Sequence, residues 1–150
     1  MSIAVSQATI GDLADLVPLF DAYRQFYGQA SDPDLARRFL FDRFEHAESI
    51  IFIARDGDRA AVGFTQLYPS FSSTRAARIF VLNDLFVTPP SRKRGVAAAL
   101  LAAAADHGRA TGADHLTLST ANTNLAARAL YKAQGWRRDD VYLTYDLPLS

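Results

Sequence analysis

One stretch of the chain, residues 83–101, constrains the fold more than any other. It reads NDLFVTPPSRKRGVAAALL. Its apolar start suits a buried strand, and Pro89-Pro90 ends that strand because proline cannot donate to a sheet ladder. A basic turn containing Gly95 then leads into a helix rich in alanine and leucine. The N–H groups of a helix start lack internal partners and favour anions such as phosphate, so the stretch predicts a strand–turn–helix unit with an anion site.

Length and charge exclude several classes of function. A chain of 150 residues without an evident linker predicts a single domain, residues 1–150. Its 16 basic and 16 acidic residues cancel, which argues against a nucleic-acid or membrane partner. The absence of cysteine excludes disulfides and thiolate chemistry, and the three scattered histidines suggest no metal site. We see no signal peptide and no run long enough to cross a membrane, so we expect a cytoplasmic protein without a metal.

Helical periodicity predicts two helices in the first third of the chain. After a first strand at residues 3–5, a helix is expected to begin at Asp12 and to end at Gly28. Pro18 should kink this helix, unless the helix starts later than Asp12. A second helix is expected from Pro33 to about His46, with Asp32 as its cap and with Leu35, Phe39, Leu40 and Phe44 on its buried side.

The remainder alternates strands and helices. Residues 49–54, 61–68 and 77–87 predict an antiparallel meander, with Pro69 closing its second strand. Helices are expected over residues 94–111 and 124–134, with a strand at residues 115–119 between them. Residues 136–137 and 141–147 are expected to be two final strands. The class is therefore mixed α/β, and the crossover from residue 87 to residue 116 makes one parallel pair.

Two motifs carry a resemblance to a known family. Arg92-x-x-Gly95-x-Ala97 lies between a strand and a helix and matches the Arg/Gln-x-x-Gly-x-Gly/Ala signature of the GNAT superfamily of N-acetyltransferases. It lacks the Lys-Ser/Thr of a P-loop and the three glycines of a Rossmann turn. Downstream, Asn124-x-x-Ala127-x-x-x-Tyr131 followed by Gly135-Trp136 resembles the family's Asn-x-x-Ala-x-x-x-Tyr-x-x-x-Gly-Phe motif. Because both motifs occur in the right order, the chain is identified as a member of this superfamily.

The resemblance implies a fold and a cosubstrate. GNAT proteins have a mixed, mostly antiparallel sheet that splays between two parallel central strands, with helices on both faces, and bind acetyl-CoA in the splay. By this resemblance, strand backbone at residues 85–87 would pair with the pantetheine arm, and the turn would hold the pyrophosphate. The implied cofactor-binding residues are Leu85, Phe86, Val87, Arg92, Lys93, Arg94, Gly95, Val96, Ala97, Asn124, Ala127 and Tyr131.

Acetyl transfer from a thioester to an amine also needs proton transfers. An amine with a pKa near 10.4 is mostly protonated at pH 7, and freeing its lone pair costs about 4–5 kcal/mol. A carboxylate or ordered water should take that proton, and a phenol should protonate the departing thiolate. We predict Asp84 as the base, with Asp21, Asp42 and Glu45 in reserve, and Tyr131 as the acid. Strict alternation would point Asn83 and Asp84 to opposite sides of the strand.

The acceptor and the assembly are less constrained. The LNDLFV segment resembles the polyamine and histone acetyltransferase branch, in whose polyamine enzymes a glutamate often occupies the position of Asn83. We predict a small primary amine (a polyamine, amino acid or aminoglycoside) or a protein lysine as acceptor. The predicted acceptor-binding residues are Tyr23, Tyr27, Tyr68, Asn83 and Asp84. The alternating segment 141–147 predicts a homodimer through an exposed strand edge.

Other interpretations stay open at this point. The turn at residues 92–94 can be a solvated basic turn, Tyr131 a core aromatic, and Asn124 a helix cap. Asp84 can be a structural partner of an arginine or of the backbone. A non-catalytic acyl-CoA-binding module is the main alternative to an enzyme. A nucleotide-phosphate binder of another kind would require the second motif to be accidental.

Overall fold

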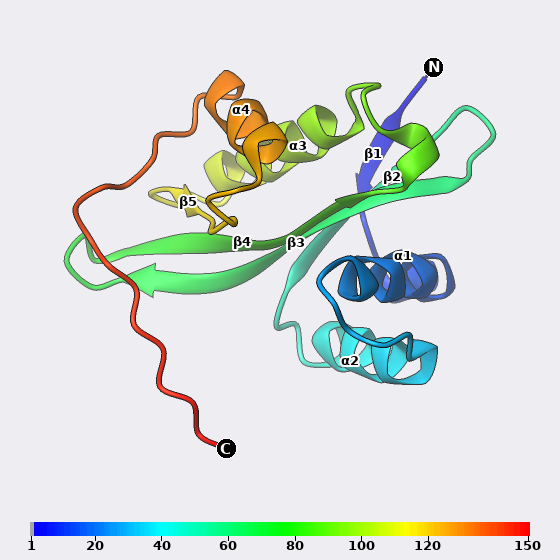
Figure 1. Cartoon of the computed structure of the whole chain (residues 1–150), viewed down its shortest axis with the longest axis horizontal. Helices are drawn as coiled ribbons and strands as arrows, with labels where there is room; N and C mark the ends of the chain where they lie inside the picture. Colours follow the sequence, from blue (N-terminus) through cyan, green and yellow to red (C-terminus); the bar gives the residue numbers. More distant parts are fainter. Residues whose placement is uncertain (1) are drawn as a thin grey trace. The chain divides into compact units, whose positions relative to one another are not determined.

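The computed structural model describes residues 2–150, which divide into two compact units, Met1–Ser119 and Thr120–Ser150. The first unit contains a five-stranded sheet in the order β1-β2-β3-β4-β5 (Figure 1). All neighbouring strands are antiparallel except β4 and β5, which are parallel, so the predicted mixed α/β class is confirmed. The strands are β1 Ala4–Gln7, β2 Ile50–Arg55, β3 Ala61–Ser72, β4 Ala77–Val87 and β5 Leu116–Thr117. That the chain is one domain stays a prediction.

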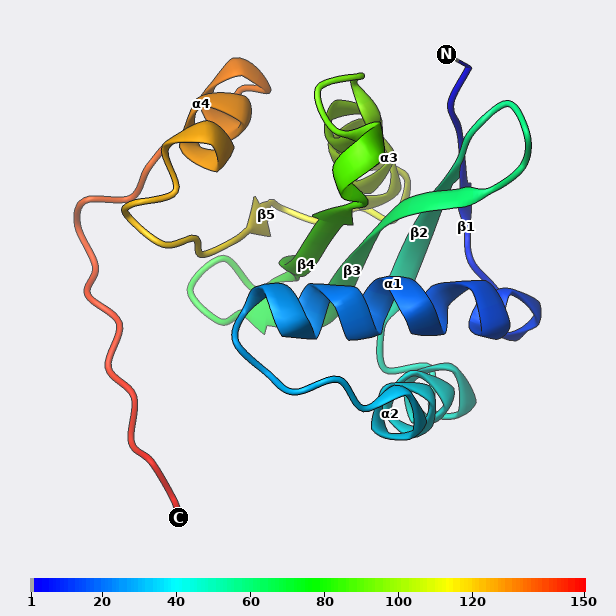
Figure 2. The ribbon, with the colours of Figure 1, turned by 45° about the vertical axis from the view of Figure 1, so that its right-hand side comes forward.

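Helices cover both faces of this sheet, as expected. Helices α1 (Leu13–Phe26) and α2 (Pro33–Glu45) lie on one face, and α3 (Val96–Ala110) lies on the other (Figures 1 and 2). A 3-10 turn, η1 (Ile10–Asp12), precedes α1, and a second, η2 (Pro89–Ser91), follows β4. Helix α4 (Leu125–Ala133) belongs to the second unit.

Helix α1 begins at Leu13, directly after the expected Asp12, and runs through Pro18. The alternative of a later start is therefore wrong, and Figure 2 shows one continuous helix. Pro18 is exposed, whereas its neighbours Val17 and Leu19 are buried. The carbonyl that loses its partner to proline therefore lies on the side that water reaches, while burial of the apolar side holds the helix together.

A buried carboxylate joins α1 to α2. Asp21 is 6% exposed and accepts hydrogen bonds from Ser31 Oγ (2.7 Å), Asp32 N (2.8 Å) and Gln25 Nε2 (3.1 Å). The Ser31 bond above all holds the pKa of Asp21 below its usual value. Asp32, fixed in this way, caps α2 by accepting from Leu35 N at 3.1 Å, as predicted. The loop therefore sets how the two helices lie against each other.

Strand β4 contains a β-bulge. Gln66 pairs with Asp84, but the next residue of β3, Leu67, pairs with Leu82, so Asn83 is an extra residue on β4. An extra residue reverses the side to which later side chains point. This bulge decides which residues of β4 reach the α1 face.

The rings of β4 show this reversal. Phe80, before the bulge, packs against His107 of α3 at 5.3 Å between ring centroids. Phe86, after the bulge, packs against Tyr23 of α1 at 6.4 Å. Perfect alternation would put both phenylalanines on one face. Asp84, two residues before Phe86, consequently also faces α1 and α2.

Strand β3 is longer than expected, because it continues through Pro69 to Ser72. Beyond Leu67, β3 is paired with β4 alone, since β2 begins at Ile50, the partner of Leu67. Pro69 pairs with Phe80 where one side of the strand is open, and proline is tolerated on such an edge. Residues beyond Pro69, such as Phe71, which pairs with Arg78, therefore belong to the β3–β4 hairpin.

The two final strands predicted at residues 136–137 and 141–147 are wrong, since residues 136–150 contain no strand. Their alternating side chains are highly exposed, for instance Val141 at 81% and Tyr145 at 88%. A strand needs a neighbour to satisfy its backbone, and an alternating pattern alone does not supply one. In α2, Leu40 is buried as expected, whereas Leu35 in the first turn is 39% exposed, so its expected burial is wrong.

Candidate active site

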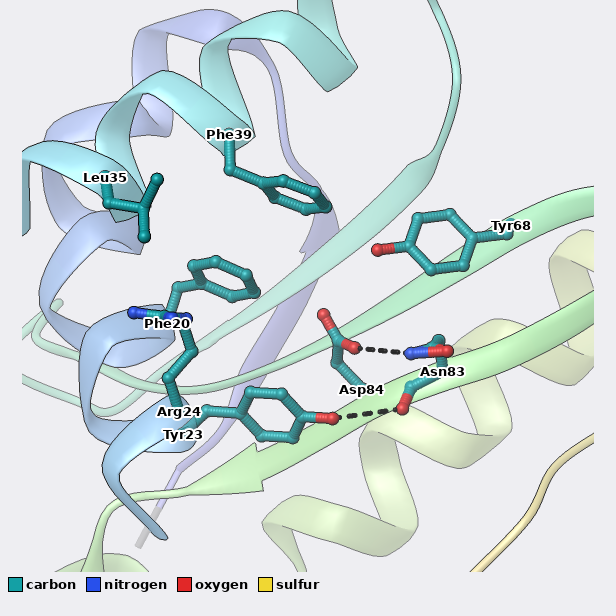
Figure 3. Close-up of a pocket in the computed structure, with 8 residues that line it drawn as sticks. All are labelled: Phe20, Tyr23, Arg24, Leu35, Phe39, Tyr68, Asn83 and Asp84. Carbon is teal, nitrogen blue, oxygen red and sulfur yellow. Dashed lines mark hydrogen bonds between the residues drawn. The ribbon is translucent and has the colours of Figure 1, made fainter. Parts of the chain in front are cut away.

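A pocket of about 330 Å³ opens between the α1–α2 face and the sheet. Side chains from α1, α2, β3 and β4 line it, and Figure 3 shows them converging on one space. All of them belong to the first unit of the chain. The lining residues are Phe20, Tyr23, Arg24, Leu35, Phe39, Tyr68, Asn83 and Asp84.

Asp84 is the buried acid of this pocket, with 2% of its surface exposed. Its carboxylate accepts hydrogen bonds from Gln66 Nε2 and from Asn83 Nδ2, the latter at 3.2 Å. Burial raises the pKa of Asp84 to about 6, although hydrogen bonding, from Gln66 above all, opposes that rise. A carboxylate with this pKa is ionised at neutral pH and still holds a proton well, which suits a general base.

Two phenols flank the carboxylate. The Tyr23 hydroxyl donates to the Asn83 carbonyl at 3.2 Å, and Figure 3 shows Tyr68 reaching toward Asp84 from β3. Burial raises the pKa of both phenols above the ordinary value, and the charge of Asp84 raises it further. Both groups are therefore protonated at neutral pH, so each carries a hydroxyl hydrogen that can be donated.

Asn83 and Asp84 both line the pocket, so the expectation that only one of them faces it is wrong. The bulge at Asn83 is the physical reason, because alternation fails at that residue. Asn83 is exposed and Asp84 is buried. The amide therefore sits at the mouth, while the carboxylate forms the floor.

The basic turn presents backbone donors. Lys93 (φ 61°) and Gly95 (φ 82°) both adopt the left-handed conformation, and Gly95 is the N-cap of α3. Glycine has no side chain to cap the helix, so the first N–H groups of α3 are left to solvent or a ligand. Lys93 and Arg94 are exposed beside them. This donor set fits a pyrophosphate, because consecutive N–H groups at a helix start form an anion-binding concavity.

Arg92 ties the turn to the end of β4. Its Nε donates to the Val87 carbonyl at 2.9 Å, and its guanidinium lies 5.6 Å from the ring centroids of both Phe26 and Phe86. Arg92 is therefore exposed but held by these contacts, unlike a side chain that meets solvent alone. Arg92 thus fixes where the turn begins relative to the strand.

Strands β4 and β5 separate soon after they meet. They pair at Phe80–Leu116 and Val81–Thr117, and β4 then continues to Val87 with β3 as its neighbour. Strand β5 therefore does not cover residues 85–87 of β4, where Arg92 occupies the Val87 carbonyl, and an extended ligand can pair with an uncovered sheet edge as a strand does. The predicted splay lies at this point.

The second motif lies in the second unit of the chain. Asn124 Oδ1 accepts from Ala127 N at 3.2 Å, so Asn124 caps α4. Tyr131 packs against Trp136 with 6.0 Å between ring centroids, and Gly135 ends the helix with φ 90°. Ala127 and Tyr131 are both partly buried, as expected for residues four apart on one helix face.

The structure adds residues to the predicted set and leaves others outside the pocket. Arg24 and Gln66 were missed, since nothing local in the sequence connects them with Asp84. Tyr27 is 57% exposed and contacts Tyr23 at 5.1 Å without lining the pocket. Of the reserve bases, Asp21 is committed to the α1–α2 loop, and neither Asp42 nor Glu45 lines this pocket.

Comparisons with known proteins decide the family. The model of the acetyltransferase (GNAT) family matches residues 16–136. The chain belongs to the GNAT family. It is 46% identical over 143 residues to the uncharacterized N-acetyltransferase YhfO of Bacillus subtilis (strain 168), covering 95% of each chain. It is 34% identical to a probable acetyltransferase of Haemophilus influenzae, covering 90% of each.

A solved structure supports the same assignment. The crystal structure of a probable acetyltransferase superposes with a TM-score of 0.93 at 40% identity, covering 98% of each chain. The protein is thus an N-acetyltransferase of the GNAT family, whose enzymes use acetyl-CoA, and its predicted fold is confirmed. Within residues 2–150, no helix is long and apolar enough to cross a membrane, and no cluster of three or more acidic or histidine side chains is placed to hold a metal.

Proposed function

We propose that this GNAT enzyme transfers the acetyl group of acetyl-CoA directly to a primary amine that enters the pocket, with Asp84 as the general base. The observation that carries the proposal is a buried carboxylate of raised pKa at the floor of a pocket with aromatic walls. A purely structural carboxylate is normally paired so that its pKa falls, as that of Asp21 does.

The chemistry assigned to Asp84 follows from its surroundings. Acetyl-CoA supplies an activated acyl group, and the amine must lose a proton to attack it. Ionised Asp84 accepts that proton, while the Tyr23 and Tyr68 hydroxyls are positioned to orient the amine by hydrogen bonding. The amides of Gln66 and Asn83 hold the carboxylate in place. A positioned base of this kind contributes about 10²–10⁴-fold in rate.

Cofactor binding is proposed for the turn and for the free edge of β4. The N–H groups of residues 93–97 would hold the pyrophosphate, and the backbone of residues 85–87 would pair with the pantetheine arm. Asn124 and Ala127 are proposed to contact the cofactor from α4, on the strength of the second motif alone. Binding should therefore be sensitive to the backbone conformation at Gly95.

Tyr131 is proposed as the acid that protonates the departing thiolate. A Tyr131→Phe variant removes the hydroxyl and keeps the ring packing against Trp136. We expect kcat to fall by about 10²-fold or more with unchanged thermal stability. An unchanged kcat would refute the role of Tyr131 as the acid, while the proposed acetyl transfer would stand.

Thiol release from acetyl-CoA with a panel of amines tests the proposed function as a whole. The panel should span polyamines, amino acids, aminoglycosides and a lysine peptide, since the polyamine or histone branch stays a prediction. We expect thiol release with at least one amine, and we expect mass spectrometry to detect its N-acetyl product. Acetyl-CoA binding without turnover on any amine would favour the acyl-CoA-binding module.

We also propose a homodimer and a cytoplasmic location. The exposed apolar side chains of residues 141–147 support the dimer, because contiguous exposed apolar surface of this kind is typical of protein–protein interaction sites. Light scattering at micromolar concentration should give the mass of two chains. The mass of one chain, 16.5 kDa, would contradict the dimer.

A further inference from the structure

We propose that the acceptor carries an anionic group, a carboxylate or a phosphonate-like oxyanion, in addition to its amine, and that Arg24 binds this group. The inference rests on the acetyl transfer proposed above and narrows its acceptor. Arg24 would be a specificity-determining residue, because it contacts the acceptor at a distance from the reacting amine.

Arg24 lines the pocket with an unused donor. Its Nη1 is buried, and no hydrogen-bond partner for this atom lies among residues 2–150. A buried charged donor without a partner is costly, and such atoms in native structures call for an explanation. A ligand oxyanion in the pocket would supply the bond that the protein does not.

Asp21, three residues before Arg24 on α1, does not neutralise the charge of Arg24. It exerts a charge interaction on Arg24, but no ion pair between the two is present in the described chain. Its oxygens are occupied by Ser31, Gln25 and the Asp32 backbone. The guanidinium therefore keeps its binding capacity for a ligand.

The charges around the pocket disfavour a polycationic acceptor. Asp84 is the one carboxylate among the eight lining residues. Arg24 is the one cation among these eight, because Arg43, 4.4 Å over the Phe39 ring, lies outside them and is paired with Glu48 at 3.1 Å. A second ammonium of a polyamine would meet Arg24 and no second carboxylate among the lining residues, and like charges brought together reduce affinity.

The geometry fits a short zwitterion. Figure 3 shows Arg24 on the α1 side and Asp84 on the sheet side, with Phe20 and Phe39 among the residues around the space. Apolar walls suit the methylene groups of such an acceptor. A planar guanidinium matches carboxylate and phosphonate oxygens with two parallel bonds, so both classes of oxyanion should bind.

Kinetics with matched acceptors test the proposal. Glycine, β-alanine and γ-aminobutyrate would be compared with their N-methylamides, with aminomethylphosphonate and with putrescine. We expect kcat/KM of the preferred amino acid to exceed that of its amide by about 10–100-fold, the range for a hydrogen bond to a charged group. The series also gives the best spacing between amine and anion, and the phosphonate separates the two oxyanion classes.

Variants at Arg24 should remove this preference. Arg24→Met should lower kcat/KM for the amino acid toward that for its amide, mainly by raising KM. Arg24→Lys should retain part of the preference. Arg37→Met is the matched control, because Arg37 is an exposed arginine of α2 outside this pocket. Thermal melts of all three would show that the variants are folded.

Two results would overturn the proposal. One is that the wild type acetylates the amides or putrescine as well as, or better than, the amino acids. This would refute the requirement for an anionic group, while the proposed acetyl transfer would stand. The other is an amino-acid preference that survives in Arg24→Met. If no amine is acetylated, the proposed function fails. The role of Arg24 can then be tested separately, by calorimetry of amino-acid and amide binding to the CoA-bound protein. Tighter binding of the amino acid than of its amide, lost in Arg24→Met, would support Arg24, and equal binding would refute it.

Discussion

The pocket around Asp84 and the turn at residues 92–97 are built in opposite ways. The pocket gathers side chains from four elements that are far apart in the sequence, and its key acid is 2% exposed. The turn is local and exposed, and it presents backbone N–H groups beside Lys93 and Gly95, which both adopt left-handed conformations. We infer that the pocket carries the proton chemistry and the turn carries cofactor affinity, so changes in each should affect different kinetic constants.

The largest expected effect is that of Asp84→Asn on the pocket. Asparagine keeps the shape of aspartate and cannot act as a base. We expect kcat to fall by about 10²–10⁴-fold, with KM for acetyl-CoA within about twofold of the wild type. Steady-state thiol release measures both constants. A large rise in KM for acetyl-CoA with kcat preserved would reverse the division of roles.

Gly95→Ala is the matching change in the turn. Gly95 has open space for a Cβ, so the expected effect comes from its φ of 82° alone. Holding an L-residue there costs about 1–2 kcal/mol. If that strain is relieved by moving the turn, KM for acetyl-CoA should rise by about 10-fold, with kcat little changed. Gly112→Ala, another positive-φ glycine with open space, is the control for strain in general.

A smaller effect is expected on the pH dependence of folding stability, to which the buried carboxylate of the pocket contributes. The pKa of Asp84 is raised from 3.8 to about 6 in the folded protein, so the folded state binds the proton more tightly than the unfolded state. This group therefore favours folding below pH 3.8, and that contribution is lost as the pH rises through about 6. The loss is on the order of 3 kcal/mol.

Asp84→Asn should then stabilise the protein at pH 7.5 by about 1–3 kcal/mol and have little effect near pH 4. Gln66 Oε1, a buried acceptor without a partner among the described residues, can take the new amide hydrogen if the Gln66 amide rotates. Urea unfolding at the two pH values measures this difference. Equal destabilisation at both pH values would mean that the carboxylate has a structural role instead.

The same contrast explains what the sequence could predict. The turn, the α3 start and the β4–β5 pair were predictable because a local motif and hydrophobic periodicity specify them. The pocket was only partly predictable. Asp84 could be predicted from its place on β4. That Asn83 and Asp84 both line the pocket depends on a β-bulge, which an alternating sequence pattern does not reveal.

Two further misses have physical causes of the same kind. Arg24 and Gln66 reach Asp84's surroundings through tertiary packing, and no spacing in the sequence links them. The expected strands at residues 136–147 had the right alternation, but pairing depends on a neighbouring strand rather than on the segment itself. Non-local partners therefore account for most of what the sequence did not reveal.

The most direct test of Asp84 as the base is the pH dependence of kcat/KM for the amine, measured for the wild type and Asp84→Asn. The wild-type profile should fall below an inflection near pH 6, because protonated Asp84 cannot accept the proton of the amine. The variant should lose that inflection and retain the one set by the amine itself. An inflection near pH 6 that persists in Asp84→Asn, at wild-type rates, would contradict the assignment.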